Sequence, residues 1–319
     1  MTMFRLRRRR LLLLLILPLF LFSDAHGEVR PPPPVTEMKA IQAAVIGIVE
    51  GLTEYLPVSS TGHIILAQRS MGIGFNPDDE AAREAADAFA ICIQLGAILA
   101  VLGIFFGHVK SIVLGLFGRD QDGRRLLINV ATGMLPAIVI GLALNELIKE
   151  YLFGLWPTVG AWFCGGLVIL VIDRRYKTRR ESDAGMTLAE LGWKGALLIG
   201  LMQCIAMWPG TSRSLVTILG GLFVGLKLRE AVIFSFILGM ATLSAATAYD
   251  GFRHGGLMLD LYGPTSLGLG MFTALISAIV AVKWMVAYLN KHGMALFGYY
   301  RIALALVVAA LLMTGTLAA

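Results

Sequence analysis

The stretch E-G-L-T-E-Y-L-P-V-S-S-T-G-H runs from Glu50 to His63 and interrupts an apolar segment that extends from Ile41 to Leu66. Pro57 ends any helix that enters this stretch, and the hydroxyl side chains after it are suited to start a second helix. Polar groups are costly at membrane depth, so they usually mark a functional site there. The stretch therefore predicts a broken helix that carries a site inside a membrane.

A second apolar segment, from Gly195 to Leu226, is broken in the same way by P-G-T-S-R-S at Pro209 to Ser214. Irregular backbone at membrane depth is tolerated only where it is buried in protein or lines a wet cavity. We therefore expect each segment to form a re-entrant helical hairpin whose tip reaches the middle of the bilayer.

The composition indicates an all-α polytopic membrane protein, because 57% of the 319 residues are hydrophobic and only 15% are charged. Six further stretches are long enough to cross a bilayer. They are about Asp87 to Gly107, Leu126 to Leu147, Leu155 to Ile172, Arg229 to Tyr249, Ser266 to Leu289 and Tyr299 to Leu317.

Basic residues orient these spans. They gather in the loops 108–125 and 173–194 and at Lys291 and His292, which fall on one side if the spans alternate. Positive loops stay in the cytoplasm. We therefore expect a multi-pass membrane protein whose basic loops face the cytoplasm, with the acidic segment before the first span outside.

The N-terminal residues 1–25 have the anatomy of a secretory signal peptide. Five arginines precede the apolar run Leu11 to Phe22, and the small-x-small pattern Ser23-Asp24-Ala25 follows. An uncleaved anchor helix is the alternative. Residues 26–37 form a Pro-rich linker, and residues 38–319 are expected to be a single membrane domain. The N-terminal segment supplies +4 of the formal net charge of +6, so the total charge indicates no nucleic-acid partner.

The two hairpins resemble each other. A shift of 153 residues pairs Gly47 with Gly200, Glu50 with Gln203, Tyr55 with Trp208 and Ser59 with Ser212. Each hairpin is followed by three spans, so the chain predicts an inverted repeat, with one unit at about 38–172 and the other at about 193–319. Inverted repeats place their site where the units meet. Chance similarity between two apolar segments is the alternative.

The first hairpin carries two carboxylates without a local counter-charge. Glu50 and Glu54 lie one helical turn apart, and no Lys or Arg lies between Ala40 and Leu66. They must share a proton, bind a cation or meet a partner from elsewhere. If they bind a cation, their oxygen ligands suit a hard one such as Mg²⁺ or Ca²⁺.

Hydroxyl groups and glycines follow in both hairpins, in patterns suited to phosphate. In the first hairpin Ser59, Ser60, Thr61 and Gly62 surround a helix start, and in the second Gly210, Thr211, Ser212 and Ser214 surround Arg213. Helix N-termini bind phosphate oxygens, and a guanidinium donates to them in a planar fork. His63 is a candidate acid, base or nucleophile. Pairing of Arg213 with Glu50 or Glu54 to hold the hairpins together is the plainer alternative.

Other chemistries lack support. The three cysteines, Cys92, Cys164 and Cys204, have no CxxC spacing, and the chain has no GxGxxG, Walker loop or HExxH motif. Zinc, nucleotide and dinucleotide sites are therefore not expected.

The two motifs, at this separation and in this order, resemble the signature regions of the bacterial undecaprenyl-diphosphatase family, the bacitracin-resistance type of lipid phosphatase. Lesser similarities run from about Met38 to the C-terminus, for example at Phe297 to Arg301. Leu215 and Ala241 stand where the family commonly has Gly and Pro, and the N-terminal extension is additional. These departures put the hairpin geometry in doubt but leave the reaction class unchanged.

The resemblance implies hydrolysis of undecaprenyl diphosphate to the monophosphate lipid carrier that cell-wall synthesis reuses. It also implies a divalent cation, an active site open to the outer face, and membrane lipid as a partner; a homodimer stays open. The functional positions of the family map onto Glu50, Glu54, Ser60, Thr61, His63, Ser212 and Arg213.

Combining both lines of reasoning, we expect Ser60 to attack the terminal phosphorus while His63 or Glu54 takes its proton and Arg213 balances the phosphate charge. The rival assignment makes His63 the nucleophile and Ser60 a phosphate ligand. The rival class is a polyprenyl-phosphate transporter or flippase, because inverted repeats with broken helices also serve transport. A purely structural scaffold would leave the buried charges without a purpose.

Overall fold

The computed structural model describes residues 38–74, 80–152, 154–181 and 184–317. The expected signal peptide and Pro-rich linker lie outside these residues. Within the described part the chain folds into helices and turns, and its one strand-like contact is an isolated bridge between Met186 and Leu226. The prediction of an all-α protein is confirmed.

Two short helices form each hairpin, and longer helices follow. The first hairpin comprises α2 (Ala40–Thr53) and α3 (Ser60–Ser70), and the second comprises α8 (Trp193–Gln203), η2 (Cys204–Met207) and α9 (Arg213–Val224). The other elements are α4 (Glu80–Ile104), α5 (Phe106–Leu116), α6 (Gln121–Leu152), α7 (Leu155–Glu181), η1 (Leu188–Glu190), α10 (Leu228–His292) and α11 (Ala295–Met313).

Five of the described helices, α4, α6, α7, α10 and α11, are long and apolar enough to cross a membrane. Helix α10 contains both the fourth and the fifth expected span, because the chain stays helical through the residues expected to connect them. The one non-helical residue inside it is Gly263, with φ 74° and ψ 160°. Pro264 excludes a helical conformation of the preceding residue, and glycine tolerates the positive φ. The connection is therefore a sharp break in a helix.

Two other segments differ from the expectation. Helix α4 begins at Glu80, so the described residues of the acidic segment expected before the first span lie in its first turns, and α5 lies in the stretch expected to be a loop. Tertiary packing supports the added helical residues. For example, the Tyr262 hydroxyl donates to the carbonyl oxygen of Ala82 at 3.3 Å, and its ring meets that of Phe89 edge-on.

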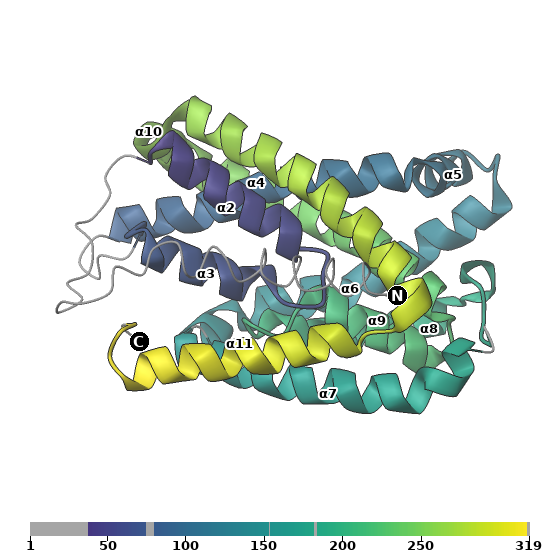
Figure 1. Cartoon of the computed structure of the whole chain (residues 1–319). Coiled ribbons are helices and arrows are strands. Elements are labelled where there is room, and N and C mark those ends of the chain that lie inside the picture. The colour runs from purple at the N-terminus through teal and green to yellow at the C-terminus, as the bar shows by residue number, and fades with distance from the viewer. Residues whose placement is uncertain (1–37, 75–79, 153, 182–183, 318–319) are drawn as a thin grey trace.

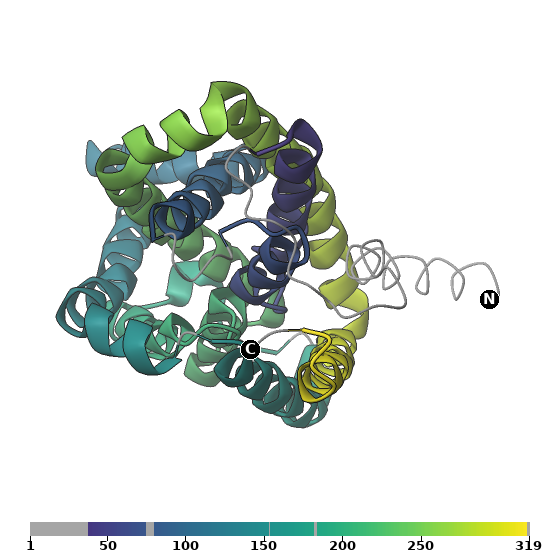
Figure 2. The same cartoon turned by 90° about the vertical axis from the view of Figure 1, so that its left-hand side faces the viewer.

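The long helices pack against the hairpins. Helix α10 packs against α4 and α2, α11 packs along α7, and α6 packs against α8. Seen end-on in Figure 2, the dark blue segment of the first hairpin lies inside the ring of longer helices. Glycines bring backbones together at two of these contacts. A side chain at Gly47 would overlap the carbonyl of Gly270, and one at Gly200 would overlap the backbone of Gly133.

Candidate active site

The tips of the two hairpins share an unusual backbone conformation. Ser59 and Ser212 each have φ 74°, and they are the non-glycine residues with positive φ in the described part of the chain. A left-handed conformation costs an ordinary residue about 1–2 kcal/mol, so it persists only where the surroundings impose it. Each serine immediately precedes the second helix of its hairpin, α3 or α9. The chain therefore turns in the same way at both tips.

Direct hydrogen bonds join the two tips. The hydroxyl of Ser214 donates to the carbonyl oxygen of Leu56 at 2.9 Å, and the hydroxyl of Ser212 donates to the same oxygen at 3.4 Å. Leu56 lies in the turn that ends α2. The predicted meeting of the two hairpins is thus present in the structure.

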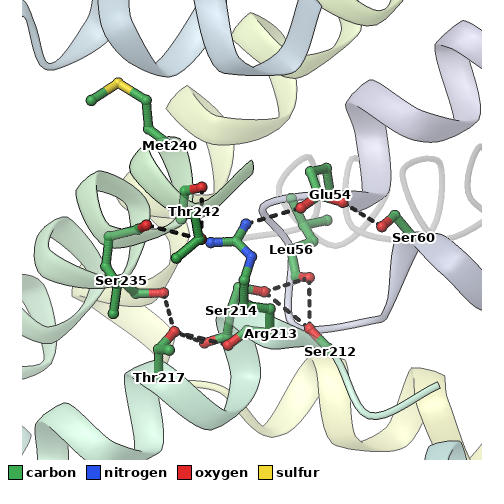
Figure 3. A network of polar contacts seen from close by, with 12 residues as sticks. Glu54, Leu56, Ser60, Ser212, Arg213, Ser214, Thr217, Ser235, Met240 and Thr242 are labelled. Carbon is green, nitrogen blue, oxygen red and sulfur yellow. Dashed lines mark hydrogen bonds and ion pairs between the residues drawn. The ribbon is translucent and has the colours of Figure 1, made fainter. Parts of the chain in front are cut away.

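One carboxylate connects both tips. Glu54 Oε1 accepts from Arg213 Nη2 at 2.9 Å, and its second oxygen accepts from the hydroxyl of Ser60. Figure 3 shows the guanidinium pointing at Glu54, with Ser60 on the other side of the carboxylate. A hydroxyl bonded to a carboxylate can lose its proton to that carboxylate as the oxygen attacks.

The guanidinium of Arg213 uses only some of its N–H groups in hydrogen bonds. Its Nε and Nη1 have no hydrogen-bond partner among the described residues, and its side chain is 13% exposed. The ring of Tyr55 lies 5.7 Å from its central carbon, and the absence of a side chain at Gly239 makes room for it, since a Cβ there would overlap the guanidinium. The guanidinium is thus held against Glu54 while part of the side chain stays exposed.

Glu50 is enclosed. It has no exposed surface, and neither of its carboxylate oxygens has a hydrogen-bond partner in the described part of the chain. Orphaned oxygens of this kind fit a proton or a hard cation. The described residues hold no cluster of three or more His, Cys, Asp or Glu side chains that could bind a metal. Protein carboxylates alone would thus give a cation few ligands, and the phosphate oxygens of a substrate would supply others.

His63 has both ring nitrogens engaged. Its Nδ1 lies 2.6 Å from the carbonyl oxygen of Ser59, and its Nε2 lies 2.7 Å from the hydroxyl of Tyr300. A carbonyl can only accept, so Nδ1 carries the hydrogen and Nε2 accepts from the tyrosine in the neutral ring. The imidazole also contacts the rings of Trp162 and Tyr300. In this arrangement His63 fixes the conformation of the first tip.

Arg301 is a functional candidate that the sequence reasoning missed. Its side chain is fully buried and donates to five carbonyl oxygens: those of Pro57 in the first tip, Gly210 and Thr211 in the second, and Ala161 and Trp162 in α7. The indole nitrogen of Trp162 also donates to the carbonyl of Val58 at 3.1 Å. A charged residue in the apolar stretch of α11 was the available signal. Arg301 thus binds the backbones of both tips to one helix.

A cavity of about 340 Å³ opens between the tips. It is lined by Glu54, Ser59, Ser60, Thr61, Gln94, Ala137, Gln203, Ala206, Met207, Trp208, Pro209, Gly210, Ser212, Arg213, Thr242, Leu243 and Ala246. Hydroxyl groups, the Glu54 carboxylate, the amides of Gln94 and Gln203 and the guanidinium form its polar part, and apolar side chains form most of the remainder. This mixed lining suits a ligand with an anionic head and an apolar tail.

Seven of the twelve predicted site residues line this cavity: Glu54, Ser59, Ser60, Thr61, Gly210, Ser212 and Arg213. Glu50, Gly62, His63, Thr211 and Ser214 lie behind its wall. Gly62 faces the ring of Trp162, which a Cβ would overlap, and the carbonyl of Thr211 accepts from Arg301. These five residues thus lie within the hairpins and do not line the cavity.

Comparison with known proteins agrees with the motifs. The family model described as bacitracin resistance protein BacA matches residues 43–307. Undecaprenyl-diphosphatase 2 of Rhodospirillum rubrum is 42% identical over 276 residues, which is 86% of this chain and 96% of that protein. The undecaprenyl-diphosphatase of Azotobacter vinelandii is 40% identical over 269 residues, or 84% and 92% of the two chains. That of Variovorax paradoxus is 41% identical over 278 residues, or 86% and 96%. The chain therefore belongs to the bacitracin resistance protein BacA family.

Proposed function

We propose that this protein is an integral membrane phosphatase that hydrolyses undecaprenyl diphosphate to undecaprenyl phosphate and inorganic phosphate. The names of its relatives support this substrate. Its product is a lipid carrier that cell-wall synthesis can reuse, and its activity confers resistance to bacitracin, as the family description suggests. The single observation that carries the proposal is the placement of the Glu54 carboxylate between the Ser60 hydroxyl and the Arg213 guanidinium.

In the proposed mechanism the Ser60 oxygen forms a bond to the terminal phosphorus, and the bond from that phosphorus to the bridging oxygen breaks. Undecaprenyl phosphate leaves, and the Ser60 proton passes to Glu54. Water then attacks the phosphorus of the phosphoserine, and the bond from that phosphorus to the Ser60 oxygen breaks. The Ser60 oxygen takes its proton back from Glu54, and inorganic phosphate leaves as dihydrogen phosphate with the oxygen and both protons of the water. Arg213 lines the cavity and stabilises the charge on the phosphoryl oxygens through its guanidinium.

The geometry favours Ser60 over His63 as the nucleophile. Ser60 lines the cavity and its hydroxyl is bonded to a carboxylate, whereas His63 lies behind the wall with both nitrogens occupied. An attacking nitrogen would have to give up the Ser59 or Tyr300 contact. We therefore assign His63 to positioning of the first tip and Glu54 to proton transfer.

A divalent cation, Mg²⁺ or Ca²⁺, fits this site at Glu50 and Glu54. Glu50 has two oxygens without a partner among the described residues, and Glu54, one helical turn further along, lines the cavity where the diphosphate would lie. Mg²⁺ is commonly held by one or two carboxylates together with substrate phosphates. Such a cation would neutralise charge on the diphosphate.

We further propose six membrane crossings, with the two hairpins re-entrant and the units 38–172 and 193–319 related as an inverted repeat in the bacterial inner membrane. The break at Gly263 would separate two crossings within α10. Three pairs at the 153-residue shift support the repeat: the positive-φ residues Ser59 and Ser212, the closely packed Gly47 and Gly200, and the buried Glu50 and Gln203. The site would face the periplasm.

Release of inorganic phosphate from undecaprenyl diphosphate by the detergent-solubilised protein tests the function. The wild type should release phosphate without a sealed membrane, and Ser60→Ala and Arg213→Ala should each lose at least about a hundredfold in rate. Ser70→Ala is the matched control, because Ser70 lies at the other end of α3 and its hydroxyl bonds only to the carbonyl of Leu66. A wild-type protein that releases no phosphate, as expected of a transporter, would contradict the proposal.

A further inference from the structure

Two glutamine side chains in the cavity wall make no hydrogen bond within the described part of the chain. Gln203 ends α8 and is 4% exposed, and its Oε1 is buried without a partner. Gln94, in the middle of α4, is half-buried and lines the same cavity. A buried amide without a partner is destabilising, whichever way its oxygen and nitrogen are oriented. Gln203 therefore has the character of a ligand-binding group, and Gln94 lines the same cavity.

A buried glutamine with a structural role looks different in this protein. Gln68, at the end of α3, is 7% exposed, and its amide nitrogen donates to the carbonyl of Ala86 at 3.0 Å. Its partner belongs to α4, so the bond joins two helices. Gln203 makes no such bond although it is equally buried.

The position of Gln203 indicates why an amide is present. It lies nine residues before Ser212, as Glu50 lies nine residues before Ser59. In the first hairpin this position holds a carboxylate, which can only accept and would repel a phosphate. In the second hairpin it holds a neutral side chain of the same shape, which can donate. The exchange removes one negative charge from a cavity that must admit an anion.

The neighbours of Gln203 indicate which part of the ligand it meets. Ala206 and Met207 follow it in η2 and contribute to the aliphatic lining, whereas Ser60 and Arg213 come from the tips. Given the proposed function, on which this inference rests, the terminal phosphoryl group lies at Ser60. The phosphoryl group that stays on the lipid lies toward the aliphatic lining.

We propose that Gln203, assisted by Gln94, binds the phosphoryl group that remains attached to the lipid after the reaction. A neutral donor holds this group for positioning and still lets the monophosphate product leave. The two amides thereby contribute to the recognition of a lipid diphosphate, while the tips act on its terminal group.

Product inhibition separates the two phosphoryl positions. In the detergent phosphate-release assay, Gln203→Leu should raise the inhibition constant for undecaprenyl phosphate and the KM for undecaprenyl diphosphate by about tenfold. The inhibition constant for inorganic phosphate should stay within about twofold of wild type, because that product occupies the terminal position. Gln68→Leu is the matched control: it should lower thermal stability and leave both inhibition constants unchanged.

Gln203→Glu keeps the shape of the side chain and replaces Gln203→Leu in the same assay if the leucine variant does not fold. It should raise the inhibition constant for the lipid phosphate further, because a carboxylate repels it. Equal shifts in both inhibition constants, no shift in either, or a lower Mg²⁺ requirement in Gln203→Glu would each overturn the inference. If the wild type itself releases no phosphate, the proposed function fails first and takes this inference with it.

Discussion

Replacement of Arg301 by lysine tests whether the two tips are held by a common clamp. The guanidinium donates to five carbonyl oxygens, two of them at 2.8 Å, and Gly165 leaves room for it in α7. A lysine ammonium has three donors and a different shape, so at least two buried carbonyls lose their partner. Each unpaired group costs about 1–3 kcal/mol, which makes the expected destabilisation about 2–6 kcal/mol.

A loss of this size is a large fraction of the roughly 5–15 kcal/mol that stabilises a typical folded protein. Thermal unfolding in detergent, followed by tryptophan fluorescence, should show a midpoint lower by at least about 4 °C. The tips would also move relative to each other, so phosphate release should fall at least about tenfold at temperatures where Arg301→Lys is folded. Arg174→Lys is the control, because Arg174 is exposed at the end of α7.

Two results would contradict the role of Arg301 in holding the two tips together. An Arg301→Lys protein that unfolds within about 1 °C of wild type would mean that the five contacts contribute little to stability. A protein that is destabilised but fully active in the cold would mean that Arg301 stabilises the fold without positioning the tips.

Two other substitutions probe the site and the loop between α5 and α6. Gly239→Ala should lower phosphate release by about a hundredfold, because its methyl group displaces the guanidinium of Arg213 from Glu54. Gly255→Ala in the same helix is the control, since its methyl group meets open space and the variant should be fully active. Equal activity of the two variants would contradict the assigned role of Gly239. Hydrogen bonds from the Gly123 backbone and the Ser111 hydroxyl lower the pKa of Asp120 below its ordinary 3.8. The charged carboxylate therefore stabilises the fold above pH 3.8, and this stabilisation is lost as the pH falls through the lowered pKa. Asp120→Asn should therefore lower the unfolding midpoint at pH 7 and match wild type in acid; an equal difference at both pH values would contradict this assignment.

Much of the site could be predicted because its chemistry is local in sequence. Pro57 and the glycine of P-G-T-S-R-S mark the two turns, and the 153-residue shift pairs Ser59 with Ser212, which share one backbone conformation in the structure. The family prediction is confirmed by the match over residues 43–307. A short motif that must break a helix and carry polar groups leaves few alternatives in an apolar chain.

Features that depend on distant contacts could not be predicted. The sequence names His63 as a candidate base but cannot show that Tyr300, far along the chain, occupies its second nitrogen. Arg301 could have been singled out as a charge in an apolar stretch, yet its five carbonyl partners come from three separate segments. Residues 250–262 contain glycines and charges that favour a loop, and they are helical where α10 packs against α4. Tertiary packing overrides local propensity there.

The most direct test of Ser60 as the nucleophile is to identify which residue carries the phosphoryl group during turnover. The wild-type protein would be mixed with undecaprenyl diphosphate and quenched in acid, which preserves phosphoserine, and in alkali, which preserves phosphohistidine, and its peptides would be mapped by mass spectrometry. We expect a phosphoryl group on Ser60, the hydroxyl that is bonded to Glu54 opposite Arg213. A phosphoryl group on His63, or on any other residue, would contradict it.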